Sequence, residues 1–452
     1  MKQVKEAPKI IDVMAETDIL VVGSGPAGLA AAVSAARTGV KTMLVDRYGC
    51  FGGAITQVGV GTMAWYRYEG TVDTQGIGIE FEQRAKEMGA SNSLPQSRSE
   101  VLDAEMFKYV ADSMVQEAGI EPLLHSTAVD AVMEANTIKG IIIESKSGRQ
   151  AILAKRVVDA TGDADIAYLA GAPCHKTPKK DMMGVTVMFS CAGVNRERFL
   201  EYVVDNLSTF GDWGQNWEIE TTGKEDDLLS AYLEEPFNRA REAGLIPKEM
   251  TSIGGSWSSL TDAGEAPCLN MIYMLNYDAT DVRDLTRAEM DGRHQAVLAI
   301  EALKKFVPGF ENAKLRNYGM TLGVRDTRKI VGRYNLTEQD VRNQARFEDS
   351  IGIFPEFMDG YGVLALPTTG RYFQVPYGIL VSEKVENLLV AGRCVAGDRI
   401  SHAAVRSMMC CTVTGQGAGV AAAVSINNNV SCSEVDIQKV QKALRKQDVR
   451  IL

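Results

Sequence analysis

Closely spaced cysteines, long apolar runs and basic clusters are all missing from this chain. The eight cysteines are scattered, without CxxC or CxxxxC spacing, which argues against dithiol chemistry and favours free thiols in a reducing, cytoplasmic setting. No run of about 18 apolar residues occurs, so we expect no membrane span. The formal net charge is −10 and no basic face is concentrated, which argues against a nucleic-acid partner.

Histidine is also scarce. The four histidines, at positions 125, 175, 294 and 402, lie on separate predicted elements and lack metal-ligand spacing, so we expect no metal. A G-x-S-x-G elbow, the signature of an α/β hydrolase, is missing. Before the first predicted strand there is no apolar core of signal-peptide length.

A complete nucleotide-binding pattern is present over residues 18–46, DILVVGSGPAGLAAAVSAARTGVKTMLVD. A buried strand is followed by Gly23, Gly25 and Gly28 and by a helix of small residues. The first glycine permits a tight turn, the second lets a pyrophosphate approach the backbone, and the third lets the helix pack closely. A second strand ends at Asp46, whose carboxylate suits ribose hydroxyls and disfavours a 2′-phosphate. The pattern fits NAD or FAD, and its structural alternative is a glycine-rich turn in an ordinary α/β domain.

The residues after Asp46 favour a flavin. They read RYGCFGGAIT, and the ribityl chain and isoalloxazine ring need the close backbone approach that Gly52 and Gly53 allow. This loop resembles that of FAD-dependent oxidoreductases distantly related to fumarate reductase flavoproteins, in which an acid precedes a G-C/F-L/F-G-G-x-x-T loop. Residues 123–158 alternate like a β-meander, and DATGD at 159–163 is similar to the ATG element of the glutathione-reductase-like FAD fold.

The C-terminal part carries the same resemblance. NLLVAGR at 387–393 predicts a buried strand, and GQGAG at 415–419 belongs to a helix of small residues. Gly397-Asp398 stands where related flavoproteins place an acid on the ribityl hydroxyls. His402 and Arg406 are four residues apart and therefore share a helix face. A second strand–GxGxxG–helix unit is missing, which argues against a separate NAD(P)H domain.

The resemblance implies an α/β fold. A Rossmann-like FAD-binding domain of the glutathione-reductase type, with three layers, would carry an inserted α+β substrate or cap domain. The expected parts are the first part of the FAD-binding domain at 1–165, the inserted domain at 166–375, the second part at 376–430 and a C-terminal helix or tail at 431–452. Within the insertion we expect irregular aromatic stretches at 189–191, 211–217 and 254–257, a strand at 268–277 and a helix at 283–306.

The implied cofactor is FAD. We expect it to be non-covalent, because no histidine lies between residues 1 and 124, where fumarate reductases attach their flavin; Cys50 is the alternative attachment point. The vicinal pair Cys410-Cys411 is interpreted as helix packing rather than a redox disulfide. The residues that we expect to bind FAD are Gly23, Gly25, Pro26, Ala27, Gly28, Asp46, Arg47, Gly52, Gly53, Thr56, Ala128, Ala160, Thr161, Gly162, Gly392, Gly397 and Asp398.

Four residues are candidates for catalysis. His402 would be a general acid or base or a donor to the flavin, with Arg406 compensating charge near the flavin N1–C2=O edge; the alternative for His402 is a hydrogen-bonded residue at a helix N-terminus. GVRDTR at 323–328 looks like the family's G-x-R-E-T-R element, with aspartate in place of glutamate. Arg325 or Arg328 would anchor an acidic substrate or stabilise negative charge on reduced flavin. The alternative is an interdomain salt bridge through Asp326.

These features together predict an enzyme. We expect an FAD-dependent oxidoreductase that transfers a hydride between flavin N5 and a small organic substrate, by dehydrogenation or by reduction of an activated double bond. Its partners would be that small molecule and an unidentified electron donor or acceptor. Assembly into a homo-oligomer is compatible with this size and fold class. The alternatives are an electron-transfer flavoprotein subunit that passes electrons to a partner chain, and a non-catalytic nucleotide-binding scaffold.

Overall fold

One largely parallel sheet joins the two ends of the chain. The computed structural model describes residues 2–5, 7–67, 73–94, 97, 99–206, 217–220, 232–367 and 370–451. The sheet has the strand order β6-β2-β1-β9-β8-β7, with β22 also paired to β9. Its strands are β1 (Val13–Val22), β2 (Thr42–Val45), β6 (Glu121–Leu123), β7 (Thr127–Glu134), β8 (Thr137–Ser145), β9 (Gly148–Asp159) and β22 (Leu388–Val390).

Strand β9 is the centre of this sheet. Its first half pairs with β8 in antiparallel fashion, its second half pairs with β22 in parallel fashion, and β1 runs parallel along almost its whole length. The predicted β-meander and the predicted C-terminal strand therefore meet on one strand. As a result Val22, Asp159 and Val390 lie in register at the same carboxyl edge of the sheet.

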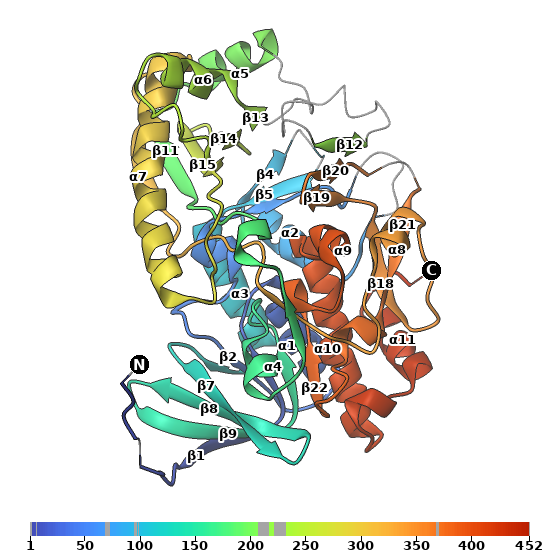
Figure 1. The fold of residues 1–452 in the computed structure, drawn as a ribbon. Coiled ribbons are helices and arrows are strands. Elements are labelled where there is room, and N and C mark those ends of the chain that lie inside the picture. Colours follow the sequence, from blue (N-terminus) through green and yellow to red (C-terminus); the bar gives the residue numbers. More distant parts are fainter. Residues whose placement is uncertain are drawn as a thin grey trace.

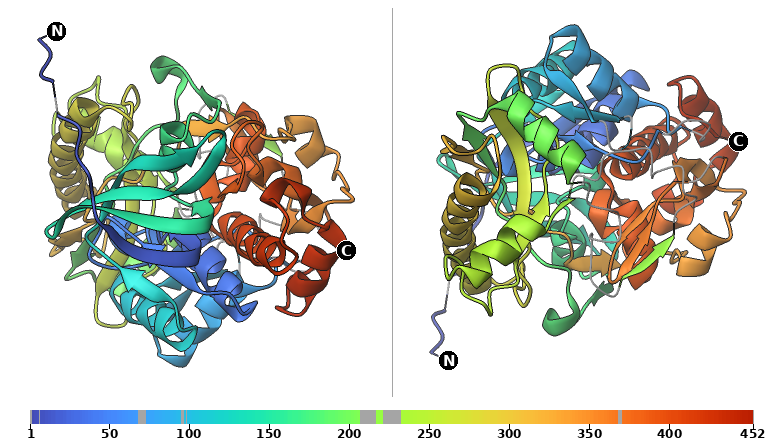
Figure 2. Two further views of the ribbon diagram at one scale, coloured as in Figure 1. Left: turned by 90° about the horizontal axis from the view of Figure 1, so that it is seen from below. Right: turned by 90° about the horizontal axis from the view of Figure 1, so that it is seen from above.

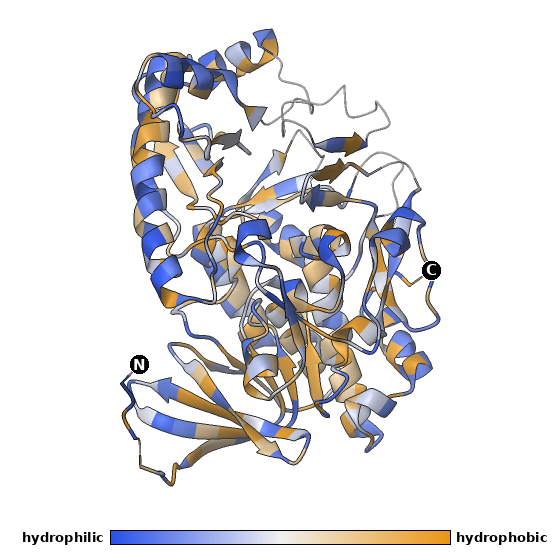
Figure 3. Ribbon diagram, in the orientation of Figure 1, coloured by the Kyte–Doolittle hydropathy of each residue, from blue (hydrophilic) through white to orange (hydrophobic). Residues whose placement is uncertain are grey.

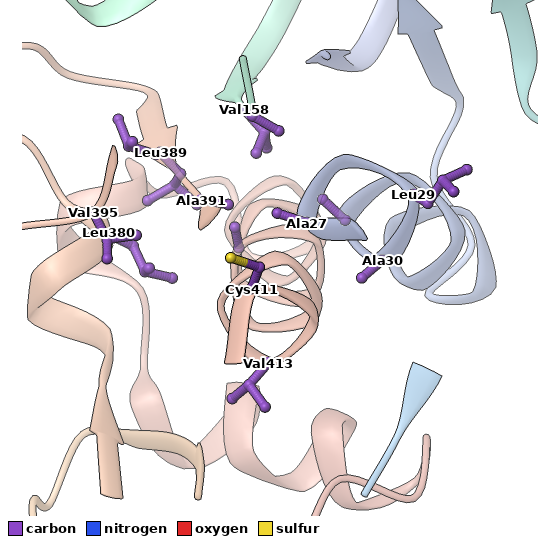
Figure 4. Close-up of a cluster of buried hydrophobic side chains, with 14 of the residues drawn as sticks. Ala27, Leu29, Ala30, Val158, Leu380, Leu389, Ala391, Val395, Cys411 and Val413 are labelled. Atoms are coloured by element: carbon purple, nitrogen blue, oxygen red, sulfur yellow. The ribbon is translucent and has the colours of Figure 1, made fainter. Parts of the chain in front are cut away.

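Two helices from opposite ends of the chain pack together on this sheet, α1 (Pro26–Arg37) and α10 (Met408–Asn427). A Cβ atom on Gly415 would overlap the carbonyl oxygen of Ala27, and one on Gly419 would overlap that of Ala31. Because both contacts advance together along the two helices, the helices run parallel. Figure 4 shows Ala27 of α1 directed toward α10. The small residues of α1 and α10 therefore allow backbone-to-backbone packing.

Helix α10 is long and apolar enough to cross a membrane by length and composition, yet 94% of its apolar window is buried inside the protein. It packs between α1, α2 (Ile77–Glu87), α11 (Ile437–Arg445) and β18 (Ser350–Pro355). Its Cys410 and Cys411 are buried free thiols in the core, which confirms their packing role. These contacts make α10 a core helix.

A second hydrophobic core lies between residues 185 and 322. Its antiparallel sheet has the order β13-β14-β15-β11-β16 and is covered by the 25-residue helix α7. In both views of Figure 2 this helix (yellow) lies on the side opposite the C-terminal helices, and Figure 3 shows both hydrophilic and hydrophobic residues along it. The elements are α5 (Arg196–Asp205), α6 (Glu235–Glu242), α7 (Val282–Phe306), β11 (Phe189–Ala192), β13 (Tyr232–Leu233), β14 (Ile253–Ser256), β15 (Glu265–Ile272) and β16 (Lys314–Tyr318).

Two stretches that were expected to be irregular are strands. Residues 189–191 lie in β11, and 254–256 lie in β14. A Cβ atom on Gly255 would overlap the carbonyl oxygen of Asn270 on the neighbouring strand, so this glycine permits close strand pairing where its composition suggests a loop. Of the third stretch, residues 211–216 lie outside the described residues.

The second core is narrower than the predicted insertion at 166–375. Described residues from Ile330 to Val375 pack with the first core instead, because β18, which pairs in antiparallel fashion with β21 (Tyr372–Pro376), packs against α10 and α11. Figure 1 shows this strand pair on the right, away from α7. The domain boundaries themselves stay a prediction.

Most of the remaining elements contribute buried residues to the first core. The remaining elements are η1 (Ala54–Val58), β3 (Thr62–Met63), β4 (Ser91–Leu94), β5 (Ser99–Leu102), α3 (Ala104–Glu117), α4 (Asp165–Leu169), β10 (Cys174–Lys176), η2 (Lys179–Asp181), β12 (Glu218–Glu220), β17 (Arg328–Ile330), α8 (Glu338–Arg342), β19 (Met358–Gly360), β20 (Val363–Ala365), β21 (Tyr372–Pro376), η5 (Tyr377–Leu380), η6 (Gly392–Cys394), α9 (Arg399–Val405) and η7 (Cys432–Glu434).

Candidate functional site

The three glycines of the nucleotide-binding loop have different surroundings. Gly23 has φ +92°, and a Cβ atom there would collide with the backbone of Ala160. A Cβ atom on Gly28 would overlap the carbonyl oxygen of Gly23. At Gly25 the nearest atom is the Cα of Gly53, 3.9 Å away. The protein itself therefore needs the first and third glycines, whereas the second leaves space where a pyrophosphate would lie.

The acid at the end of β2 is bound to this loop. Asp46 is 7% exposed, and its carboxylate accepts hydrogen bonds from Ser24 N at 2.7 Å, Ser24 Oγ at 2.5 Å and Tyr48 N at 2.8 Å. A carboxylate offers about four acceptor positions, so one is left for a ribose hydroxyl. Arg47 is exposed and stacks on Tyr48. The contact with Ser24 was missed from the sequence, because no pattern assigns that position.

The second glycine loop packs against the first. Gly52 N donates to Ser24 O at 2.9 Å, and a Cβ atom on Gly53 would overlap Gly25 Cα. Thr56 Oγ1 donates to Phe51 O at 2.6 Å and thereby closes the loop. The predicted residues Gly25, Gly52, Gly53 and Thr56 are therefore brought together.

Gln57, which the sequence did not single out, also belongs to this loop. Its Nε2 donates to Cys50 O at 2.8 Å, but its Oε1 is buried without a hydrogen-bond partner. An acceptor buried in this way is costly unless a ligand or water supplies a donor. The Oε1 atom therefore marks a position where a bound molecule would present an N–H or O–H group.

The DATGD segment at the end of β9 meets the same loop. Asp159 is fully buried and accepts hydrogen bonds from Thr161 N, Thr161 Oγ1 and Ala167 N. Burial raises the pKa of Asp159 to about 6. Gly162 has φ +82° beside Arg393, and Gly392 has φ +85° beside Ala27. The segment and the end of β22 therefore lie at the N-terminus of α1.

Ala128 and Asp398 lie further from the glycine loops in the sequence and have different surroundings. Ala128 lies in β7, two residues after Ser126, whose N–H donates to Asp46 O at 3.0 Å. Asp398 is exposed and caps α9, since its Oδ1 accepts from Ile400 N and Ser401 N, while Oδ2 accepts from Glu338 N. Gly397 lies against Ser401 of the same helix. The geometry favours a capping role for Asp398 over a ribityl contact.

Helices α1 and α10 present two uncapped N-termini to one region. Neither Gly25 nor Ser407 makes a side-chain cap, whereas side chains cap α3, α5, α7 and α11. Gly415 of α10 lies against Ala27 of α1. Helix α10 begins at Met408, seven residues before this contact, whereas α1 begins at Pro26, one residue before it. Because the helices are parallel, α10 extends about 9 Å further. Two positive helix ends at this spacing suit a pyrophosphate and the electron-rich edge of a flavin.

A group of polar side chains that we name the junction cluster lies between the two cores, beside the start of α10. Its members are Arg325, Asp326, Lys329, Asp359, Tyr361, His402 and Arg406. His402 is 1% exposed, and its Nε2 lies 2.9 Å from Arg325 O, while its Nδ1 has no partner. Arg406 donates to Asp359 Oδ2 at 3.0 Å, but its buried Nε has no partner. One unpartnered acceptor and one unpartnered donor therefore lie a helical turn apart.

Arg325 connects the junction cluster to the second core. Its guanidinium donates to Gly184 O at 3.0 Å and to Asn270 Oδ1 at 3.2 Å, and it lies 5.0 Å over the Tyr273 ring. Burial, and then the nearby Arg406 charge, lower the pKa of Arg325. No carboxylate of the described residues forms an ion pair with it. Such a charge suits an anionic ligand.

Arg328 has a structural role in this geometry. It forms an ion pair with Asp165 and donates from Nε to Asp163 O at 3.0 Å. Arg393 also donates to Asp163 Oδ1, at 2.5 Å. The ion-pair interpretation is therefore favoured for Arg328, although its partner is Asp165 and not the Asp326 that the sequence suggested.

The residues present fit FAD. The space at Gly25, the two uncapped helix ends, and the unpartnered Nδ1 and Nε atoms on one face of α9 correspond to a phosphate group and to a ring with adjacent N–H and C=O groups. A small nucleotide without the ring system would leave the atoms beside α10 without partners. This fit rests on the described side chains alone.

Similarity to known proteins agrees with this geometry. Thiamine thiazole synthases from Sulfolobus acidocaldarius and Saccharolobus solfataricus are 29% and 30% identical over 166 residues, which is 34% of this chain and 59% and 58% of theirs. The match thus spans less than two thirds of these relatives. The myxobacterial chondrochloren halogenase CndH has a TM-score of 0.50 at 11% identity, covering 96% of this chain and 79% of that one, which supports the fold alone.

A family model described as FAD dependent oxidoreductase matches residues 18–444. This range includes both glycine loops, the second core and α10, so the match is not confined to the nucleotide-binding pattern. The chain is therefore an enzyme of the FAD-dependent oxidoreductase family, with FAD as its cofactor.

Proposed function

We propose that this enzyme transfers a hydride between flavin N5 and a small organic substrate at the junction between the two cores. The reaction is a dehydrogenation or the reduction of an activated double bond. Bound FAD supplies the redox chemistry, and the protein supplies orientation and a dry environment. The observation that supports this most directly is the junction cluster, where the buried Nδ1 of His402 and Nε of Arg406 lack protein partners.

The first core would hold the cofactor at two helix ends. The N–H groups at the start of α1, beside Gly25, would bind the pyrophosphate. The N-terminus of α10 and the Arg406 guanidinium would stabilise negative charge on the pyrimidine edge of the ring. Gly52 and Gly53 would allow the ring system to lie close to the backbone. These groups are rigid, so little reorganisation would accompany charge development.

The second core would supply the substrate side. Arg325 has no ion-pair carboxylate partner among the described residues and is held by Asn270, which lies in β15, and by Tyr273, which follows that strand. We propose that its guanidinium binds a negatively charged group of the substrate. A charge-assisted contact of this kind contributes about 1.5–3 kcal/mol. Removing it should weaken substrate binding at least about tenfold.

His402 would act as a neutral hydrogen-bonding group. Burial, and then the Lys329 charge, lower the pKa of His402 to about 3, so the ring carries no second proton at neutral pH. The general-acid interpretation from the sequence is therefore not favoured. We propose instead that Nδ1 accepts a hydrogen bond from the bound cofactor or substrate.

An anaerobic screen tests the proposed function. Purified protein that contains FAD is mixed with small carboxylates, hydroxy acids, amines and enoates, and absorbance near 450 nm is followed. Oxidisable substrates should bleach the flavin, and activated alkenes should restore the colour of the reduced enzyme. Arg325→Gln should slow the reaction of an anionic substrate, whereas Arg293→Gln on the surface of α7 should not.

The same screen separates the alternatives. Flavin that every small molecule leaves oxidised, but that a protein partner reduces, would establish an electron-transfer subunit. Colourless protein with no affinity for FAD would establish a scaffold. If Arg325→Gln bleaches as fast as the unmodified enzyme, the proposal that Arg325 binds the anionic group is wrong, whereas the proposal of hydride transfer stands.

A further inference from the structure

A buried ion pair between Asp326 and Lys329 lies beside the Nε2 side of the His402 ring. Lys329 Nζ is 2.5 Å from Asp326 Oδ1, and the two residues are 4% and 2% exposed. Tyr361 Oη donates to the other carboxylate oxygen, Oδ2, at 2.5 Å. Burying two charges costs free energy that their attraction only partly offsets. A pair retained at this place, next to an unpartnered imidazole nitrogen, therefore calls for a specific role.

The hydrogen bond of His402 fixes which ring nitrogen carries the proton. Its Nε2 lies 2.9 Å from the carbonyl oxygen of Arg325. A carbonyl oxygen only accepts, so Nε2 is the donor and carries hydrogen. In the neutral ring Nδ1 is then a bare acceptor, and it is the atom that lacks a partner.

Charged groups face His402 from three elements. Asp326, with its Oδ1 4.0 Å from Nε2, and Lys329 come from the segment before and within β17. Arg406 lies on the same helical face, one turn onward. The Tyr361 ring lies 6.3 Å from the His402 ring, is itself covered by Arg399, and comes from the turn after β19. Asp359, which is bonded to Arg406, lies within β19.

These groups act on His402 in opposite directions. Asp326 favours a second proton on the ring, whereas burial, Lys329 and Arg406 oppose it. Burial also raises the pKa of the Tyr361 hydroxyl, and the Asp326 charge adds to this rise, so Tyr361 remains a donor to the carboxylate. The carboxylate is thus satisfied by a lysine and a tyrosine, and little of its attraction is left for the imidazole.

We propose that the Asp326–Lys329 pair is a positioning device for His402, which keeps the imidazole uncharged in its Nε2–H form and so presents Nδ1 as a constant hydrogen-bond acceptor to the molecule bound at the junction. Asp326 and Lys329 are positioning residues, because they act through His402. The inference deepens the proposed function, and rests on it only for what Nδ1 contacts. The flavin environment then does not change with protonation of His402 between about pH 5 and 8.

The four histidines make this state directly measurable. We would label histidine with ¹⁵N in the FAD-loaded protein, record spectra from pH 5 to 8, and assign His402 by its loss in His402→Gln. Its signals should show a protonated Nε2 and an unprotonated Nδ1 at every pH. His125, His175 and His294 are exposed and give the other three sets of histidine signals in the same samples.

Charge-removing variants test the role of the pair. In Lys329→Met the Asp326 carboxylate loses its counter-charge, so the His402 signals should titrate, with an apparent pKa raised by at least about two units. In the double variant Asp326→Asn/Lys329→Met both charges are gone and His402 should be neutral again. The control is Lys304→Met, which breaks an i,i+3 ion pair with Glu301 at the surface of α7.

Two results would overturn the inference. One is titration of His402 between pH 5 and 8 in the unmodified enzyme. The other is an unchanged His402 signal in Lys329→Met while FAD content and melting temperature show a folded protein. If Lys329→Met does not fold, the inference is tested by the His402 spectra of the unmodified enzyme and of the double variant. The double variant buries no unpaired charge. A failed substrate screen would refute hydride transfer without altering these spectra.

Discussion

Gly25 and Gly28 lie three residues apart, but their missing side chains have different effects. We predict that Gly25→Leu gives folded, colourless protein, because the added side chain fills the open space that a pyrophosphate needs. Gly28→Ala should instead reduce the yield of folded protein, because its Cβ would overlap Gly23 O. Flavin content per folded chain and circular dichroism measure the two effects. Stoichiometric FAD in Gly25→Leu would contradict the pyrophosphate assignment.

Asp159 gives the folded state a specific pH dependence. Burial raises its pKa to about 6, whereas in the unfolded chain it titrates near 4. Between these values the folded state binds the extra proton, so the contribution of Asp159 to stability is complete below about pH 4 and is lost as the pH rises to 6.

Urea unfolding of wild type and Asp159→Asn checks this sign. We predict that the stability advantage of the wild type over the variant shrinks between pH 4.5 and 6.5 and is level above that. The variant removes only the titrating group, so effects of other carboxylates cancel in the difference. An advantage that grows with pH over this range would refute the raised pKa.

At the scale of single residues the sequence predicted positions better than roles. Gly23, Gly25 and Gly28 lie as expected because each follows from backbone geometry. Asp398 differs, since a sequence cannot show whether a carboxylate caps the next helix or contacts a ligand. Gln57 was missed because a lone glutamine carries no periodic signal, and its importance arises only from burial.

At the scale of elements, the contact between α1 and α10 predicts different losses of stability for different glycine substitutions in α10. Gly415→Ala and Gly419→Ala add a methyl group that would overlap backbone oxygens of α1, so each should lower the unfolding free energy by about 2–3 kcal/mol. The matched comparison is Gly417→Ala on the same helix, whose added methyl group would meet the Ile351 side chain and no backbone atom of α1.

This comparison variant also gains helix propensity, worth about 1 kcal/mol. It should therefore change stability by less than about 1 kcal/mol. Thermal and urea denaturation of the three variants rank their losses of unfolding free energy. Equal losses at all three positions would show that the helices do not need backbone contact.

Elements with strong periodicity were predicted well. Helix α7 and strands β2, β9 and β22 lie within a few residues of their expected places, because apolar spacing reports burial directly. Strand β14 was not predicted, since Gly254 and Gly255 have the composition of a turn. Strand β1 is five residues longer than expected, because its largely exposed first half also pairs with β9.

At the scale of the whole molecule, FAD should stabilise the fold by joining its two ends. Binding to the folded state alone adds about 2.7 kcal/mol at a hundredfold excess over Kd. We predict that FAD raises the melting temperature of flavin-depleted protein by several degrees, with larger shifts at higher concentration, and that NAD does not. An equal shift with NAD would contradict FAD as the selective ligand.

Denaturation tests the expectation that FAD is bound without a covalent link. We predict that heat or acid releases all flavin into the filtrate. Cys50 is half-buried and its Sγ accepts a hydrogen bond from Gln57 Nε2 at 2.9 Å, which fixes the orientation of the thiol. Flavin that stays on the polypeptide, and is lost in Cys50→Ser, would establish the thioether instead.

The partnership of α1 and α10 has a consequence for biosynthesis. Ser34 of α1 donates to Gln416 O of α10 across 382 residues of sequence. A ribosome therefore produces the apolar surface of α1 long before its permanent cover emerges. Until then a chaperone or a transient neighbour must shield that surface, and loading of flavin must wait until α10 has been made. Termination of synthesis before α10 would accordingly yield aggregates rather than a smaller working enzyme.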